Sequence, residues 1–222
     1  MSAAQTEADA GQKLAAPFLD LLPITGVAIS VLDRDHKASV IHASDDTAAQ
    51  LEETQFTLGD GPLFECFATA GPVLVPSVSD DSRWPLFLSH ADQLAVGALF
   101  FFPLTLGAAC IGTVLCYRDS PGHLERETVD VGSGLARAIA GPALRHAILL
   151  ADGEADAKNT PTEMRREVHQ ATGMMLVQLD VSATDALARM RAYAFAHGVS
   201  LREVARSVVS GHLDFSTEGL IT

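Results

Sequence analysis

The sequence predicts two domains: an α+β domain with a central antiparallel sheet, followed by an all-α module of three helices. Two observations predict this organisation. In the first two-thirds of the chain, β-branched runs and helical stretches follow one another in the order α-β-β-α-α-β-α-β-β-α, which favours antiparallel strand pairing. In the last quarter, three short amphipathic stretches each begin with a hydroxyl residue and a carboxylate three positions later, a pattern typical of helix starts.

The first elements are a helix and a pair of strands. The helix is predicted over residues 7–22 and ends at Pro23, whose ring cannot continue a helix. The β-branched run 26–32 predicts a strand, and a polar turn leads to a second strand over 38–43. A short helix over 45–54 follows.

Turn residues divide the middle of the chain. The glycine-rich loop Leu58–Pro62 precedes a helix over 63–69, and Gly71-Pro72 separates this helix from a short strand at 73–75. The loop 80–85 begins another helix, which continues to about residue 94.

Two strongly apolar strands, 97–104 and 110–118, are joined by a loop around Gly107. A long helix over 123–150 completes the first domain, which is predicted to span residues 7–150. Pro142 should interrupt and kink this helix, because proline lacks the N–H that a helix interior needs.

The polar, acidic segment 151–160 is expected to be a linker, and the helical module is expected over 161–213. The three pairs that mark its helix starts are Thr160 with Glu163, Ser182 with Asp185, and Ser200 with Glu203. One apolar stripe follows the first helix at helical spacing, through Met164, Val168, Ala171, Met175 and Leu179.

Charge divides along the same boundary. The chain of 222 residues has a net charge of −13, but residues 1–160 hold 9 basic and 21 acidic residues, whereas 161–213 hold six arginines and five acids. A near-neutral module whose only basic residues are arginines permits contact with phosphate. The chain has no apolar run long enough to span a bilayer, no secretory signal is expected, and its three cysteines form no CxxC pair, so a cytoplasmic protein is expected.

The two regions resemble known domain families. Leu58–Pro62, Arg83–Phe87 and the strand ends Phe102–Leu104 and Ile111–Leu115 resemble a GAF domain, a small-molecule sensing fold. The last sixty residues resemble an ANTAR domain, a three-helix RNA-binding module. The matching positions are Arg165, Val168, Gln170, Ala171, Gly173, Asp185, Ala186, Met190, Arg191, Leu201, Val204 and Ala205.

The ANTAR resemblance implies contact with an RNA stem-loop. The candidate RNA-binding residues are Arg165, Arg166, Gln170, Thr172, Arg189, Arg191, Tyr193, Arg202 and Arg206. Thr172 stands where the family usually has lysine, and Tyr193 is a candidate for stacking on a loop base, with Phe195 expected in the core. Gly173 costs about 1 kcal/mol in mid-helix relative to alanine. Close packing against another helix is favoured as its explanation over close approach of the RNA backbone.

The larger domain offers no catalytic or metal-binding constellation, and no cofactor is expected. The residues that could flank a small-molecule pocket are Phe64, Cys66, Trp84 and Phe87, with a core role favoured for Trp84. Some GAF-like proteins reduce free methionine sulfoxide with loop cysteines, but burial is favoured for Cys66, Cys110 and Cys116.

The sequence therefore predicts a non-enzymatic, ligand-responsive regulator of the transcription-antitermination type that binds stem-loop RNA as a homodimer and does not contact membranes. The long helix 123–150 could supply the dimer contact. A protein–protein signalling adaptor is the alternative, and a thiol reductase is the third possibility. The hypothesis predicts weaker RNA binding in Arg165→Ala and Arg191→Ala.

Overall fold

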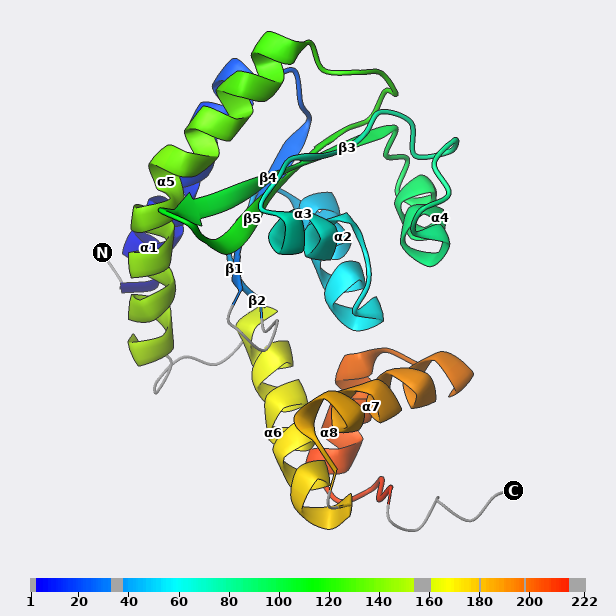
Figure 1. The fold of residues 1–222 in the computed structure, drawn as a ribbon. Coiled ribbons are helices and arrows are strands. Elements are labelled where there is room, and N and C mark those ends of the chain that lie inside the picture. The colour runs from blue at the N-terminus through cyan, green and yellow to red at the C-terminus, as the bar shows by residue number, and fades with distance from the viewer. Residues whose placement is uncertain (1–2, 33–37, 154–160, 180, 198, 216–222) are drawn as a thin grey trace. The chain divides into compact units, whose positions relative to one another are not determined.

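The computed structural model describes residues 3–32, 38–153, 161–179, 181–197 and 199–215 (Figure 1). The chain divides into two compact units, Met1–Asp156 and Ala157–Thr222. Within the described ranges, none of the helices combines the length and apolar character needed to cross a membrane.

The N-terminal unit contains a five-stranded sheet in the order β2-β1-β5-β4-β3. Every neighbouring pair is antiparallel, as the sequence predicts. The strands are β1 (Gly26–Leu32), β2 (Ala38–Ala43), β3 (Val73–Val75), β4 (Ala98–Leu106) and β5 (Ala109–Arg118).

Helices cover both faces of this sheet (Figure 1). One face carries α1 and α5, and the other carries α2, α3 and α4. Their bounds are α1 (Ala3–Leu21), α2 (Asp46–Leu58), α3 (Pro62–Thr69), α4 (Pro85–Gln93) and α5 (Arg126–Gly153).

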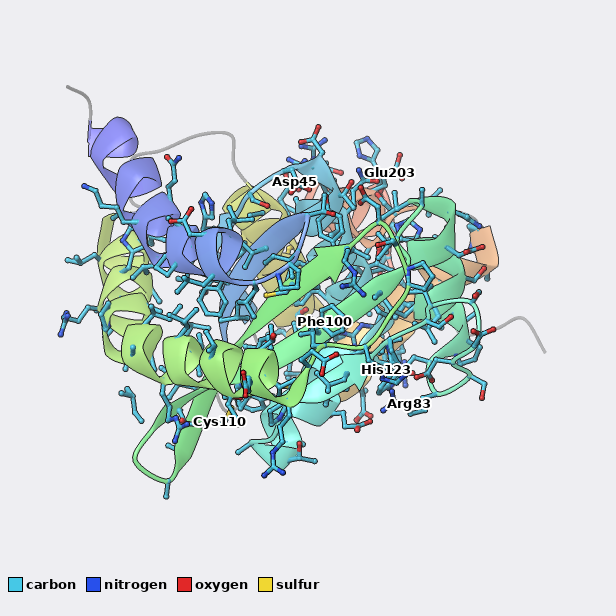
Figure 2. All side chains as sticks on the ribbon, turned by 90° about the horizontal axis from the view of Figure 1, so that it is seen from above. Asp45, Arg83, Phe100, Cys110, His123 and Glu203 are labelled. Atoms are coloured by element: carbon cyan, nitrogen blue, oxygen red, sulfur yellow. The ribbon has the colours of Figure 1, made fainter. Side chains whose placement is uncertain are left out.

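The central strands are apolar along their length because both faces of the sheet are buried. Phe100 and Phe102 of β4 pack in the core beneath α1 and α5, whereas Leu99 and Phe101 pack in the core beneath α2, α3 and α4. Figure 2 shows Phe100 inside the domain and Cys110 beside the β4–β5 hairpin. A strand covered on both faces has no polar side, which explains the continuous run of apolar residues.

Several predicted helix limits differ from the structure: α1 begins at Ala3 rather than at residue 7, and α5 begins at Arg126 rather than at residue 123. The helix expected over 45–54 continues to Leu58, where Gly59 adopts a left-handed conformation (φ 66°) and ends it. The helix expected to be interrupted at Pro142 is one continuous helix to Gly153. Because Ile139, Ala140 and Ala143 are buried on both sides of Pro142, packing on the domain holds the helix together despite the missing hydrogen bond.

The C-terminal unit consists of α6 (Pro161–Leu179), α7 (Ala183–His197) and α8 (Leu201–Val209). One side of each helix faces a shared small core. Its buried side chains are Val168, Ala171, Met175, Ala186, Met190, Ala194, Leu201, Val204, Ala205 and Val208. Of the predicted stripe on α6, Leu179 is half-buried and the side chain of Met164 lies outside the described residues.

The capping box of α8 is confirmed. The Ser200 hydroxyl accepts a hydrogen bond from the Glu203 N–H (3.2 Å), and the Ser200 N–H donates to Glu203 Oε2 (2.8 Å). At α7, the Ser182 hydroxyl accepts from the Asp185 N–H at 3.1 Å and donates to the Asp185 carboxylate. Thr160 lies outside the described residues.

Replacing Ser200 with alanine should destabilise the start of α8 by about 1 kcal/mol, because an N–H group of the first turn loses its acceptor. Hydrogen exchange of amides in α8, followed by mass spectrometry of the full chain, should accelerate about fivefold. Ser200→Asp retains an acceptor and should exchange at nearly the wild-type rate. Equal exchange in Ser200→Ala and wild type would show that the cap does not stabilise this helix.

Candidate nucleic-acid interface

Two predicted RNA-binding arginines form an ion-pair cluster that joins α8 to α6. Arg202 Nε lies 3.2 Å from Glu167 Oε2, and Arg206 Nε lies 2.9 Å from Glu167 Oε1. The side chains of Arg202 and Arg206 remain 34% and 56% exposed, whereas that of Glu167 is 25% exposed. We call Arg202 and Arg206 the α8 arginine pair. The two guanidinium groups bind a carboxylate of their own chain and still reach solvent.

The ion-pair cluster affects the pKa of the Glu167 carboxyl. Partial burial on its own would raise the pKa of the Glu167 carboxyl, but hydrogen bonds from Arg206 and Arg202 outweigh burial and hold the pKa below its usual value. A depressed folded-state pKa contributes stability that is present above the unfolded-state pKa and is lost as pH falls through the folded-state pKa. The cluster should therefore stay ionised throughout the neutral pH range.

The two arginines of α7 have different surroundings. Arg189 is exposed, but Arg191 is half-buried, and burial lowers the pKa of its guanidinium. Residues two apart lie on different sides of a helix, so these arginines do not share one face. Arg191 still carries its charge at neutral pH, since arginine does not lose its proton in proteins.

On α6, the structure removes Thr172 from the surface. Thr172 is 8% exposed, and its hydroxyl donates to the Val168 carbonyl oxygen at 2.7 Å. This position faces the core beside Ala171, so a direct contact with RNA is not available to it. Gln170 is exposed, and the side chains of Arg165 and Arg166 lie outside the described residues.

Gly173 is exposed, and a Cβ atom built there would meet nothing within 4 Å. The favoured explanation, close packing against another helix, is therefore wrong for the described part of this chain. The reason is its place in the helical period: Ala171 and Met175 face the core, and Gly173 lies on the opposite side of α6.

Tyr193 belongs to an aromatic cluster at the end of α7. Its ring stacks on His197 with centroids 3.9 Å apart, and Phe215 meets it edge-on at 5.4 Å. Its main-chain oxygen lies 2.9 Å from His197 Nδ1. Because these residues already cover Tyr193, it is a poorer platform for an RNA base than the sequence predicts. The side chain of Phe195 lies outside the described residues.

The candidate pocket residues of the N-terminal domain lie in its core. Cys66, Trp84 and Phe87 are 0%, 5% and 1% exposed, and Phe64 packs partly buried against the same cluster. The Arg83 guanidinium covers the Trp84 ring at 4.4 Å. These contacts support the favoured core role of Trp84 and leave Cys66, Trp84 and Phe87 without the solvent contact expected of a pocket rim.

The cysteines are also poorly suited to redox catalysis. Burial raises the pKa of Cys66 and Cys116, and more weakly that of Cys110. A raised pKa disfavours the thiolate, which is the reactive form. Within the described ranges, no three His, Cys, Asp or Glu residues come together as a potential metal site.

Sequence reasoning missed two residues of the C-terminal surface. Glu167 holds Arg202 and Arg206, which follow it by 35 and 39 residues, so no local pattern could reveal the pair. Val177 is 86% exposed on α6. Helical spacing places it four residues after Gly173 and away from the apolar stripe, a signal that could have identified it.

Comparison with known proteins finds similarities for both domains. The family model of the ANTAR domain matches residues 160–209. A domain from Sinorhizobium meliloti 1021, whose parent protein is assigned as a two-component sensor histidine kinase, is 15% identical with a TM-score of 0.50, covering 68% of this chain and 97% of that chain. The GAF domain region of a protein from Geobacter sulfurreducens PCA is 15% identical with a TM-score of 0.51, covering 65% and 99%.

These identities show a shared fold alone. No curated protein matches the chain. The five-stranded antiparallel sheet and the similar structures agree on the first domain, and the family model identifies α6, α7 and α8. The chain therefore joins a domain with the fold of GAF domains to a C-terminal segment that matches the ANTAR domain.

Proposed function

We propose that this protein is a ligand-responsive regulator of transcription antitermination that binds a stem-loop in nascent RNA. The observation that carries this proposal is the ANTAR match over α6, α7 and α8, whose solvent side carries the α8 arginine pair. Arginine binds phosphate through a planar group with several donors, so an exposed pair suits a polynucleotide backbone.

The proposed RNA contacts are a subset of the predicted residues. Among the described side chains, exposed or partly exposed ones supply these contacts, whereas the buried Thr172, the half-buried Arg191 and the covered Tyr193 support the domain. Arg165 and Arg166 are retained from the sequence alone. The proposed contact residues are Arg165, Arg166, Gln170, Arg189, Arg202 and Arg206.

In this proposal, the N-terminal domain would bind the signalling ligand and would provide the contact that forms a homodimer. Its α5 has exposed apolar side chains in its last turns, Ile148 at 52% and Leu149 at 64%, which favour packing against a second copy. A small molecule bound by the domain would shift the populations of two α5 arrangements and so change how two ANTAR domains engage one RNA. Neither ligand nor dimer is needed for the first test of the function.

A gel-shift experiment with transcribed leader RNA from upstream of the coding region tests RNA binding. The full chain should bind at low salt, and Arg165→Ala and Arg189→Ala should each weaken binding about fivefold, because each removes a phosphate contact. Arg137→Ala, an exposed position on α5, is the matched control and should bind like wild type. An unshifted RNA with wild-type protein would contradict the function and favour the protein–protein adaptor.

A further inference from the structure

The chain turns back on itself after α8. Gly211, two residues beyond the helix, adopts the left-handed conformation (φ 73°) that favours glycine. The N–H groups of His212 and Leu213 both donate to the Ser207 carbonyl oxygen, at 2.8 and 3.0 Å, so the reversal satisfies a carbonyl near the helix end. We call residues 211–215 the strap. The match to the ANTAR domain ends before the strap begins, so the strap lies outside the matched module.

The strap ends against an aromatic side chain of α7. The Phe215 ring meets the Tyr193 ring edge-on, with centroids 5.4 Å apart and planes at 71°. His197 stacks on the same tyrosine ring at 3.9 Å. Tyr193 and Phe215 are both half-buried, whereas His197 is exposed. Part of the cover over Tyr193 therefore comes from a segment that is not part of the matched module.

The contact between the strap and α7 is shallow. Phe215 is only half-buried and does not belong to the buried core that α6, α7 and α8 share. His212 is exposed, and its Nδ1 lies 2.7 Å from the Ser210 hydroxyl, a contact within the turn itself. A single edge-on aromatic pair favours the contact by about fivefold. The strap can therefore open at small cost, without disturbing the core of the three helices.

We propose that the strap is an autoinhibitory lid, which closes over Tyr193 and lowers the affinity of the C-terminal domain for RNA. This inference rests on the proposed function and adds a regulatory step to it. In the closed arrangement Phe215 covers the tyrosine ring, and in the open arrangement the ring is available for stacking. RNA that binds the open arrangement has an apparent affinity reduced by the fraction of molecules that are open.

The sign of one mutational effect separates a lid from a structural support. If the strap only stabilised α7, loss of the Phe215 ring would leave RNA binding unchanged or weaken it. If the strap is a lid, the same loss increases the open fraction and strengthens RNA binding. Strengthened binding cannot result from damage to the fold, because a partly unfolded domain offers fewer contacts to RNA.

Nitration of tyrosine by tetranitromethane, mapped by mass spectrometry of the full chain, tests whether the strap covers Tyr193. The chain has two tyrosines, and Tyr117 is 5% exposed, so Tyr117 is an internal control. Phe215→Ala should accelerate nitration of Tyr193 about threefold to fivefold, since the closing contact is lost, and should leave Tyr117 unchanged. Phe215→Trp retains an aromatic ring and should react like wild type.

Gel shifts with transcribed leader RNA test the inhibition. Phe215→Ala should bind the RNA about threefold to fivefold more tightly than wild type, and Phe215→Trp should bind like wild type. Adding Tyr193→Leu to Phe215→Ala should remove the gain, because the ring that the open strap exposes is then absent. The bound RNA should also slow nitration of Tyr193 in Phe215→Ala.

Each remaining outcome has a distinct meaning. RNA that binds Phe215→Ala no more tightly than wild type would overturn the lid while leaving RNA binding intact. Unchanged nitration of Tyr193 in Phe215→Ala would overturn it as well, because the strap would not cover that ring. RNA binding by Phe215→Ala alone would support both the lid and the proposed function. Leader RNA that binds neither protein would reject the proposed function, and the lid with it.

Discussion

The Gly112→Ala variant is expected to lose about 3 kcal/mol or more of stability in the N-terminal domain. A Cβ at Gly112 would overlap the Ser30 carbonyl oxygen and lie 2.8 Å from Val31 Cα. Both obstacles are backbone atoms of β1, which pairs with β5 in the centre of the sheet, with Val31 opposite Gly112. No side-chain rotation can relieve this clash, so the two strands must separate locally.

Urea unfolding followed by fluorescence measures this loss in the intact chain. Trp84 is the single tryptophan and is buried in the N-terminal core, so its emission reports on that domain. Gly134→Ala is the matched control. It lies on α5, where a Cβ meets nothing within 4 Å, and should stabilise the domain by about 0.5–1 kcal/mol. An unchanged urea midpoint in Gly112→Ala would contradict the register of β1 and β5.

The N-terminal fold could be predicted because its signals are local. The strands predicted over 26–32 and 38–43 are confirmed at the same bounds, since β-branched runs between turn residues are typical of strands. The continuity of α5 through Pro142 could not be predicted in this way. It depends on the packing of Ile139 and Ala143 in the core, and these contacts join segments far apart in the sequence.

In the candidate interface, too, features set by local sequence patterns could be predicted, and features set by contacts between distant segments could not. Helical spacing correctly places Val168, Ala171 and Met175 inside, and it could also have placed Thr172 beside them. The ion pairs of Glu167 with the α8 arginine pair could not be predicted from local sequence patterns, because Glu167 lies on α6 and the arginines lie on α8. The sequence favours Tyr193 as the base-stacking residue, but the contact of Tyr193 with Phe215 joins α7 to the segment after α8.

The second large effect concerns the α8 arginine pair. The double variant Arg202→Gln/Arg206→Gln should bind leader RNA at least tenfold more weakly at low salt. If each arginine contacts one phosphate of a single-stranded loop, the slope of log affinity against log salt should become shallower by about 1.4. Filter binding at salt concentrations from about 50 to about 300 mM measures both the affinity for leader RNA and the slope.

Glu167 requires its own control, because the double variant leaves its carboxylate without the two ion pairs described above. A triple variant that adds Glu167→Gln removes this negative charge and should recover part of the affinity but none of the slope. Arg126→Gln on α5 removes a charge elsewhere and should alter neither. If the cluster served only to hold α6 against α8, the triple variant would have a lower Tm and a wild-type slope. A shallower slope in the double and triple variants alike requires that the two guanidinium groups displace counterions from RNA, which a purely structural ion pair cannot do.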